Sequence, residues 1–347
     1  MALTILSVAY PLAPVSTDAV GGAEQVLARL DRALVAAGHR SIVIAQEGSR
    51  VAGEFVSVPR ASGVLDEAEK AAAQARHCAA IAEALARFPV DLVHLHGIDF
   101  DRYLPPPGPP VLVTLHLPPD WYPAGALSPE RPDTWFHAVS ETQHRACPAN
   151  PRLLAPIPNG IEVADYATAY RKRRYALILG RLCPEKGIHL AIEAARQAGI
   201  PLAIAGEAYP YTAHLDYLRD EIRPRLDRSR RLIGPVGGRR KRRLLGSATC
   251  LLVPSLAPET SSLVAREAIA AGTPVIAFPA GALPETVDHG RTGFLVENAD
   301  EMARAIPLAA TLDPEHCRAV ARERFSADRM IAAYLALYGR LASGCPQ

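Results

Sequence analysis

The chain has 347 residues, a length that suits two domains of roughly 150–200 residues each better than one core. Hydrophobic residues make up 49% of it and charged residues 21%, which excludes a disordered chain. The 38 Lys and Arg residues nearly balance the 36 Asp and Glu residues, so the net charge of +2 does not indicate a nucleic-acid-binding protein.

Targeting and redox signals are also lacking. No apolar run approaches the roughly 20 residues of a membrane span, and the first residues carry no basic segment of the kind that opens a signal peptide. The six cysteines are scattered, with no Cys-x-x-Cys pair, which favours reduced thiols over disulfides or a zinc framework. We therefore expect a soluble, cytoplasmic protein.

In the first half, short apolar runs alternate with helical patterns, as in parallel sheets built from β-α units. Residues 3–9 form the first expected strand. The helix after it shows apolar residues at helical spacing, from Val26 to Leu34, and ends at Gly38. An Ala-rich segment predicts a second helix over residues 68–86. The further strands expected in this half are 41–45, 54–58, 92–95, 111–115 and 136–139.

The same alternation restarts in the second half. A strand is expected over 175–179 and a helix over 188–197, followed by strands 202–205, 232–236, 251–253 and 275–278 and by a last amphipathic helix over 327–341. We expect two doubly wound domains, residues 1–160 and 161–326, with residues 327–347 as a C-terminal helix. Open α/β sheets bind ligands beyond the carboxyl ends of their strands, so we expect the site in a cleft between the domains.

Two glutamates, Glu259 and Glu267, bracket the start of a helix that follows the strand 251–253. The free N–H groups at this start, near Ser262 and Leu263, form an anion site that the helix dipole strengthens. A ligand with a diphosphate and hydroxyl-rich groups would use all of these residues. The alternative is a capped core helix with two solvated glutamates.

The turn 180–187, after the first strand of the second domain, carries glycines together with Arg181 and Lys186. A guanidinium fork and a mobile ammonium both suit a diphosphate. In the first domain, Gly21 and Gly22 open a helix whose N–H groups could also face phosphate. This is not the Gly-x-Gly-x-x-Gly fingerprint, so NAD binding is disfavoured.

These residues resemble glycosyltransferase family 4 (glycosyl transferases group 1), and the resemblance covers nearly the whole chain. Its most specific part is the Glu-x7-Glu motif at Glu259 and Glu267. Further matches are Gly21-Gly22-Ala23-Glu24, Val139-Ser140, Pro158-Asn159-Gly160-Ile161, Gly180-Arg181-Leu182, Glu185-Lys186-Gly187, Pro254-Ser255, and the segments 272–277 and 290–296. The resemblance implies the GT-B fold: two Rossmann-like domains facing each other across a cleft, with the last helix crossing back onto the first. It implies that the first domain binds the acceptor and the second the nucleotide sugar.

Residue roles follow from the same resemblance. Arg181 and Lys186 would bind the diphosphate, Glu267 the ribose, and Glu259 hydroxyls of the donor sugar. The amides near Ser262 and Leu263, and the N–H of Gly22 beside Gly21, would bind the distal phosphate. His116 would face the sugar and the reaction centre. One departure is that Glu259 is followed by Thr260-Ser261-Ser262, where the family often has Gly-x-Gly.

The activity implied is a retaining hexosyltransferase that uses a nucleoside-diphosphate sugar, with UDP favoured, and needs neither metal nor cofactor. The acceptor would be a small-molecule, saccharide or lipid-linked hydroxyl. A GT-B-fold nucleotide-sugar epimerase and a non-catalytic sugar-nucleotide-binding protein remain as alternatives.

Other polar clusters allow a second interpretation. Asp99 and Asp101 imitate an Asp-x-Asp metal motif, with His94 and His96 just before it, but loop or acceptor-wall residues are the favoured interpretation. The basic runs 171–174 and 239–243 are expected to be solvated faces, or else to contact an anionic membrane surface or a lipid phosphate. Cys183 is expected to be a structural thiol whose pKa the basic turn could lower.

Overall fold

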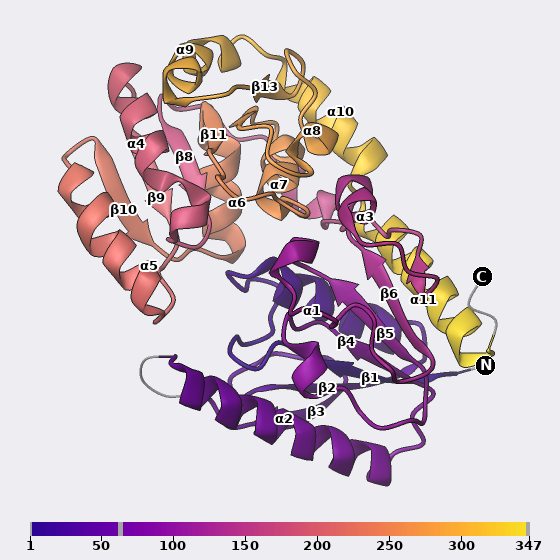
Figure 1. Ribbon diagram of the computed structural model, residues 1–347. Coiled ribbons are helices and arrows are strands. Elements are labelled where there is room, and N and C mark those ends of the chain that lie inside the picture. The colour runs from indigo at the N-terminus through magenta and orange to yellow at the C-terminus, as the bar shows by residue number, and fades with distance from the viewer. Residues whose placement is uncertain (1, 62–64, 345–347) are drawn as a thin grey trace. The chain divides into compact units, whose positions relative to one another are not determined.

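The computed structural model describes residues 2–61 and 65–344 and divides the chain into two units (Figure 1). The first comprises residues 1–159 together with 328–347, and the second comprises residues 160–327. Each is an α/β unit with its own parallel sheet and its own buried apolar core. In the part of the chain that the structure describes, no helix is both long enough and apolar enough to cross a bilayer.

The first unit contains a seven-stranded parallel sheet in the order β3-β2-β1-β4-β5-β6-β7. The central strands are apolar at nearly every position because helices cover both faces of the sheet. Helix α2 begins after Asp66, whose side chain accepts a hydrogen bond from the Glu69 N–H. The elements are β1 (Thr4–Val8), α1 (Gly22–Ala36), β2 (Arg40–Gln46), β3 (Glu54–Val58), α2 (Glu67–Arg87), β4 (Leu92–Leu95), β5 (Val111–Leu115), β6 (Thr134–Ala138), α3 (Glu141–Ala146), β7 (Leu153–Leu154) and the last helix α11 (Ala327–Ala342).

Helix α11 joins the first unit, as expected, through a buried polar network. His137 Nδ1 lies 3.0 Å from the carbonyl oxygen of Ala138. Because a carbonyl oxygen can only accept, Nδ1 carries the proton, and His137 Nε2 must accept a hydrogen bond from Thr114 Oγ1 at 2.7 Å. The Thr114 hydroxyl then accepts from His94 Nε2 at 2.7 Å, and His94 Nδ1 accepts from the Tyr338 hydroxyl of α11 at 2.8 Å. Each tautomer is therefore fixed by its neighbour.

The second unit repeats this architecture with six strands in the order β10-β9-β8-β11-β12-β13. The strand order reverses between β8 and β11, which pair in parallel, so the loops after these two strands flank the switch point where such sheets bind ligands. The elements are β8 (Ala176–Leu179), α4 (Ile188–Gln197), β9 (Leu202–Ala205), α5 (Thr212–Tyr217), β10 (Arg230–Gly234), α6 (Gly238–Ser247), β11 (Cys250–Val253), α7 (Leu263–Ala270), β12 (Val275–Ala277), α8 (Leu283–Thr286), β13 (Gly293–Leu295), α9 (Ala299–Ala309) and α10 (Pro314–Arg324).

The GT-B fold class and the alternation of strands and helices are confirmed. The strands β3, β4, β5 and β9 and the helix α4 have the expected bounds. Two strands begin two residues earlier than expected, β6 at Thr134 and β10 at Arg230, both before their most apolar residues. The bounds of five more strands differ from the expected ones by one residue at one or both ends: β1, β2, β8, β11 and β12. The strands β7 and β13 were not predicted, because two or three residues are too few to show a period.

Candidate functional site

The two loops at the switch point of the second unit touch through their backbones. The turn after β8 ends at Gly187, whose φ of 59° is left-handed. A Cβ at this position would lie 2.1 Å from the carbonyl oxygen of Pro254, in the loop after β11. The Glu185 carbonyl also accepts hydrogen bonds from the N–H groups of Leu256 and Ala257. The backbones of the two loops therefore hold them together.

This backbone contact brings Lys186 and Glu259 together. Lys186 Nζ lies 2.6 Å from Glu259 Oε1, which also accepts from the Ser255 hydroxyl at 2.5 Å. Burial acts to raise the pKa of Glu259, but Lys186 and Ser255 outweigh it and hold the pKa below its usual value. The carboxyl group is therefore ionised at neutral pH. Its side chain is 11% exposed and that of Lys186 31%, so both still reach solvent.

A second glycine fixes the position of Glu259 from the other side. Gly281 has a φ of 62°, and a Cβ there would lie 2.3 Å from the carbonyl oxygen of Glu259. The Ala282 N–H donates to that same oxygen at 2.7 Å. Neither Gly281 nor Ser255 was predicted as a site residue, although Pro254-Ser255 belongs to the recognised motifs.

Arg181 lies in the same turn, with its guanidinium 5.8 Å from the centre of the Tyr209 ring. Its charge acts on Glu259 and lowers the pKa of that carboxyl, the smallest of the effects acting on it. Arg181, Lys186 and Glu259 thus occupy one region of the second unit. Two cations and one carboxylate beside a switch point can bind an anion together with a hydroxyl-rich group.

Helix α7 follows this region and begins after Ser262. The side chain of its N-cap residue, Ser262, makes no capping hydrogen bond, and the first turn of the helix holds no acidic residue. The first N–H groups of a helix, here from Leu263 onward, have no partner within the helix. Such a helix start suits an anion.

Glu267, the second glutamate of the motif, is buried inside α7 and pairs with Lys241 of α6. Lys241 Nζ lies 2.8 Å from Glu267 Oε1, and the two side chains are 6% and 2% exposed. The expectation that residues 239–243 form a solvated face is therefore wrong for Lys241. It is also wrong for Arg242, which lies 2.6 Å from Asp165 and is 27% exposed.

In the other basic run, Lys172 Nζ donates to Thr273 Oγ1 at 2.5 Å, and burial lowers the Lys172 pKa to about 8.

The first unit holds the remaining candidates. His116 follows β5, and its Nε2 lies 3.0 Å from Nδ1 of His96, so one ring donates to the other. Burial, reinforced by His137, lowers the pKa of His116 to about 3, which keeps its ring neutral. Gly21 precedes α1 as its N-cap, and Gly22 is the first residue of the helix. The contact from His96 was not predicted, because the two histidines follow different strands, β4 and β5.

The Asp-x-Asp segment is already engaged within the first unit. Asp99 accepts from the Tyr103 hydroxyl and from Gln74 Nε2, each at 2.9 Å, and burial raises the pKa of its carboxyl. Neither aspartate belongs to a group of three metal-ligand side chains in residues 2–61 and 65–344.

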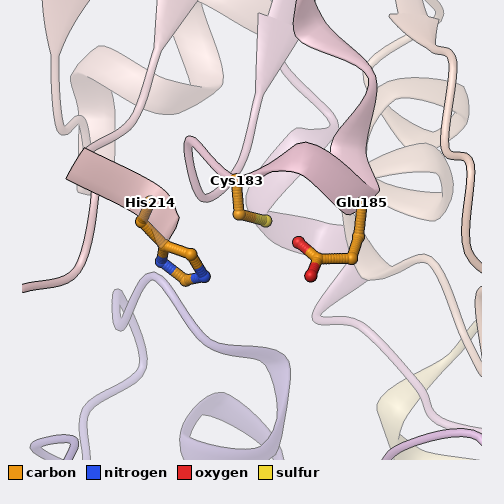
Figure 2. Close-up of side chains that lie close together, drawn as sticks. All are labelled: Cys183, Glu185 and His214. Atoms are coloured by element: carbon orange, nitrogen blue, oxygen red, sulfur yellow. The ribbon is translucent and has the colours of Figure 1, made fainter. Parts of the chain in front are cut away.

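One such group does occur, in the second unit, and it was not predicted. Figure 2 shows Cys183, Glu185 and His214 turned toward one another. One ligand atom from each, the Cys183 sulfur, a Glu185 carboxylate oxygen and a His214 ring nitrogen, lies within 4.8 Å of the other two. Sulfur, nitrogen and oxygen ligands of this kind suit Zn²⁺ better than Mg²⁺. Arg181 and Lys186 of the turn act to lower the pKa of the Cys183 thiol, as expected, but burial outweighs them and raises the pKa to about 11.

The sequence matches two family models. Residues 20–165 match the model described as Glycosyltransferase Family 4, and residues 173–310 match the one described as Glycosyl transferases group 1. A curated relative, glycogen synthase of Mycobacterium tuberculosis, is 34% identical over 50% of this chain and 44% of its own length. D-inositol 3-phosphate glycosyltransferase of Corynebacterium efficiens is 30% identical over 49% of this chain and 45% of its own. The matches thus span less than half of these relatives.

Solved structures match over nearly the whole chain. AviGT4, a glycosyltransferase involved in avilamycin A biosynthesis, is 26% identical with a TM-score of 0.73, over 99% of this chain and 98% of its own. Anabaena HepE in complex with UDP-glucose is 20% identical with a TM-score of 0.72, over 96% and 99% of the two chains. With two family models matching in succession and this fold, the chain belongs to the GT-B glycosyltransferases of family 4.

Proposed function

We propose that the protein is a retaining hexosyltransferase that moves a sugar from a UDP-sugar to an acceptor hydroxyl. The observation that carries this proposal is the pairing of Lys186 with Glu259 at the switch point, beside Arg181. It supplies cations for a diphosphate and an ionised carboxylate for sugar hydroxyls in one place. The choice of UDP rests on the family resemblance, supported by HepE, whose solved structures hold UDP and UDP-glucose.

The donor would bind without dismantling the pair. An ammonium has three N–H donors, and Lys186 uses one of them on Glu259, so two remain for a phosphate oxygen. Glu259 Oε1 is already satisfied by Lys186 and Ser255, whereas Oε2 has no partner within the described residues and can accept from a sugar hydroxyl. Arg181 would hold the second phosphate with its planar fork.

The chemistry then needs the bond between the anomeric carbon and the phosphate oxygen to break through an oxocarbenium-like state. Negative charge grows on the leaving UDP, and the fixed cations Arg181 and Lys186 stabilise it. In this proposal the acceptor oxygen attacks from the face that UDP leaves, and the leaving phosphate takes the acceptor proton. These two cations would do the work that a divalent metal does elsewhere. The roles of Gly21, Gly22, Ser262, Leu263, His116 and Glu267 rest on the resemblance.

The variant Glu259→Gln tests the proposal. It keeps the shape and the hydrogen bond to Lys186 but removes the charge, so we expect UDP still to raise the melting temperature while sugar transfer falls at least about tenfold. Glu193→Gln, which changes a partly exposed glutamate on α4 paired with Arg196, is the matched control and should behave as the wild type.

Turnover is followed by NMR with UDP-sugars alone and with an acceptor panel. A free epimer formed without acceptor would favour the epimerase alternative, and binding without any turnover would favour the non-catalytic one. Near wild-type turnover of Glu259→Gln would remove Glu259 from the site.

A further inference from the structure

The two basic runs meet at one pocket of the second unit. A pocket of about 590 Å³ is lined by Arg173, Arg239, Arg240 and Arg243, with Tyr170 and Tyr175 among its walls. Tyr175 directly precedes β8, and helix α6 ends at Ser247, shortly before β11. The pocket therefore lies at the amino ends of these parallel strands, opposite the carboxyl ends whose loops hold Lys186 and Glu259.

The four arginines carry charge that no carboxylate of the described residues neutralises. All four are exposed, and the acids that reach α6 are taken by other cations: Glu267 pairs with Lys241 and Asp165 pairs with Arg242. The one side-chain hydrogen bond in this set runs from Arg240 to the carbonyl oxygen of Ile233, at 3.4 Å. Exposed charge alone is ordinary, but here it is gathered around a concave wall.

The arrangement is also electrostatically unfavourable for the folded protein. Arg239 and Arg240 lie in the first turn of α6, where the helix dipole disfavours cations. Burial raises the pKa of Tyr175 to about 12, while Arg173 and Arg243 both act to lower it, which shows that the two runs converge on this ring. Like charges brought together destabilise a fold unless an anion lies between them.

We propose that this pocket binds a multiply charged phosphate group, either on a free phosphate ester or on the headgroup of an anionic lipid. Guanidinium groups hold phosphate oxygens through paired N–H donors, and four of them around one cavity can surround such a group. The rings of Tyr170 and Tyr175 in the pocket wall can pack against an apolar or sugar moiety attached to the phosphate. The site shares no residue with the donor site and does not depend on the proposed transferase activity.

Tripolyphosphate titration in a metal-free buffer tests the proposal, with the Lys186→Ala variant as the host so that the donor turn contributes little. When Arg239→Ser and Arg243→Ser are added to this host, we expect tripolyphosphate to bind at least about tenfold more weakly than to Lys186→Ala alone, because two charge-assisted contacts are lost. Arg228→Ser/Arg231→Ser removes two exposed arginines of the same unit outside the pocket and should change the affinity by less than about twofold. An equal loss in both double variants, or no loss in either, would overturn the proposal.

A stability measurement separates binding from a structural role. Without an anion, Arg239→Ser/Arg243→Ser should melt at or above the wild-type temperature, since repulsion is relieved. Tripolyphosphate should raise the melting temperature of Lys186→Ala but not that of the triple variant Lys186→Ala/Arg239→Ser/Arg243→Ser. A double variant that melts lower and still responds to the anion would contradict a binding site at these residues.

Vesicles distinguish the two sources of phosphate. If the ligand is a lipid headgroup, the wild type should co-sediment with phosphatidylcholine vesicles that contain phosphatidic acid, and Arg239→Ser/Arg243→Ser should remain in the supernatant. If it is a free phosphate ester, only the titration should depend on the pocket. Vesicle binding that both double variants retain, together with an unaffected titration, would refute the pocket as a phosphate site.

Discussion

The buried pair of Lys241 and Glu267 gives the sharpest test of how buried charge affects the stability of the second unit. Breaking such a pair by removing one partner leaves an uncompensated buried charge, which costs about 3–5 kcal/mol. At 2.8 Å, with both side chains less than 10% exposed, this pair has the geometry to which that range applies. Lys241→Met should therefore lower the free energy of unfolding of the second unit by about 3 kcal/mol or more. Adding Glu267→Gln should restore most of the loss, because no buried charge is then left.

The assay can localise the effect, because the two tryptophans of the chain, Trp121 and Trp135, both lie in the first unit. Urea unfolding is followed by tryptophan fluorescence for the first unit and by far-ultraviolet circular dichroism for the whole chain. The dichroism transition should move to lower urea, while the fluorescence transition of the first unit should stay in place. Arg243→Met, an exposed neighbour on α6, should change stability by less than about 0.5 kcal/mol.

Two results would refute this reasoning. A loss below about 1 kcal/mol in Lys241→Met would show that water or another group compensates Glu267. A double variant as unstable as Lys241→Met would show that the loss comes from packing and not from the stranded charge.

Three further outcomes are expected. Lys186→Ala should lose at least about tenfold in kcat at saturating donor in a steady-state assay, since its contact to phosphate strengthens in the transition state; a rise in donor KM alone would count against this. Transfer should survive EDTA in both the wild type and Cys183→Ser, measured as initial rates; a loss on chelation that Mn²⁺ or Mg²⁺ restores would contradict metal independence. The free energy of unfolding should fall as the pH drops from about 6.5 toward 4, because burial lowers the pKa of His137 to about 4, so the unfolded chain binds the proton first; a flat pH profile of urea midpoints would contradict it.

Much of the fold could be predicted because the central strands of both sheets are covered on both faces. Such strands are short apolar runs, and 92–95 and 111–115 were predicted with the bounds of β4 and β5 for that reason. Edge strands are less apolar, so composition predicts their bounds less well. β10 begins with the polar pair Arg230-Arg231, and β7 has two residues, so pairing with a neighbour defines these strands more than their own composition does.

The residues alone showed the donor region as separate motifs, and only the family resemblance joined Arg181, Lys186 and Glu259 into one expected donor site. Arg181 and Lys186 follow β8, while Glu259 follows β11 and lies 73 residues beyond Lys186 in the chain. Only the strand order, with β8 next to β11, places these loops side by side, and neither motif allows that order to be predicted. Ser255 and Gly281 act on Glu259 through contacts that need the same topology, so the Pro254-Ser255 motif could mark Ser255 but no local pattern could show that either residue contacts Glu259.

The spacing of residues 239–243 along a helix predicts which of them is buried, although their charge is uniform. Five consecutive cations resemble equivalent members of one surface, yet a helix turns each of them in a different direction. Lys241 precedes the fully buried Leu245 by four residues, and positions four apart lie on the same face of a helix. Helical periodicity alone therefore puts Lys241 on the buried face, and a buried lysine requires a buried carboxylate nearby. Arg239 and Arg243, also four apart, share the opposite exposed face, so one helix holds both a structural ion pair and the uncompensated charge that an anion can satisfy.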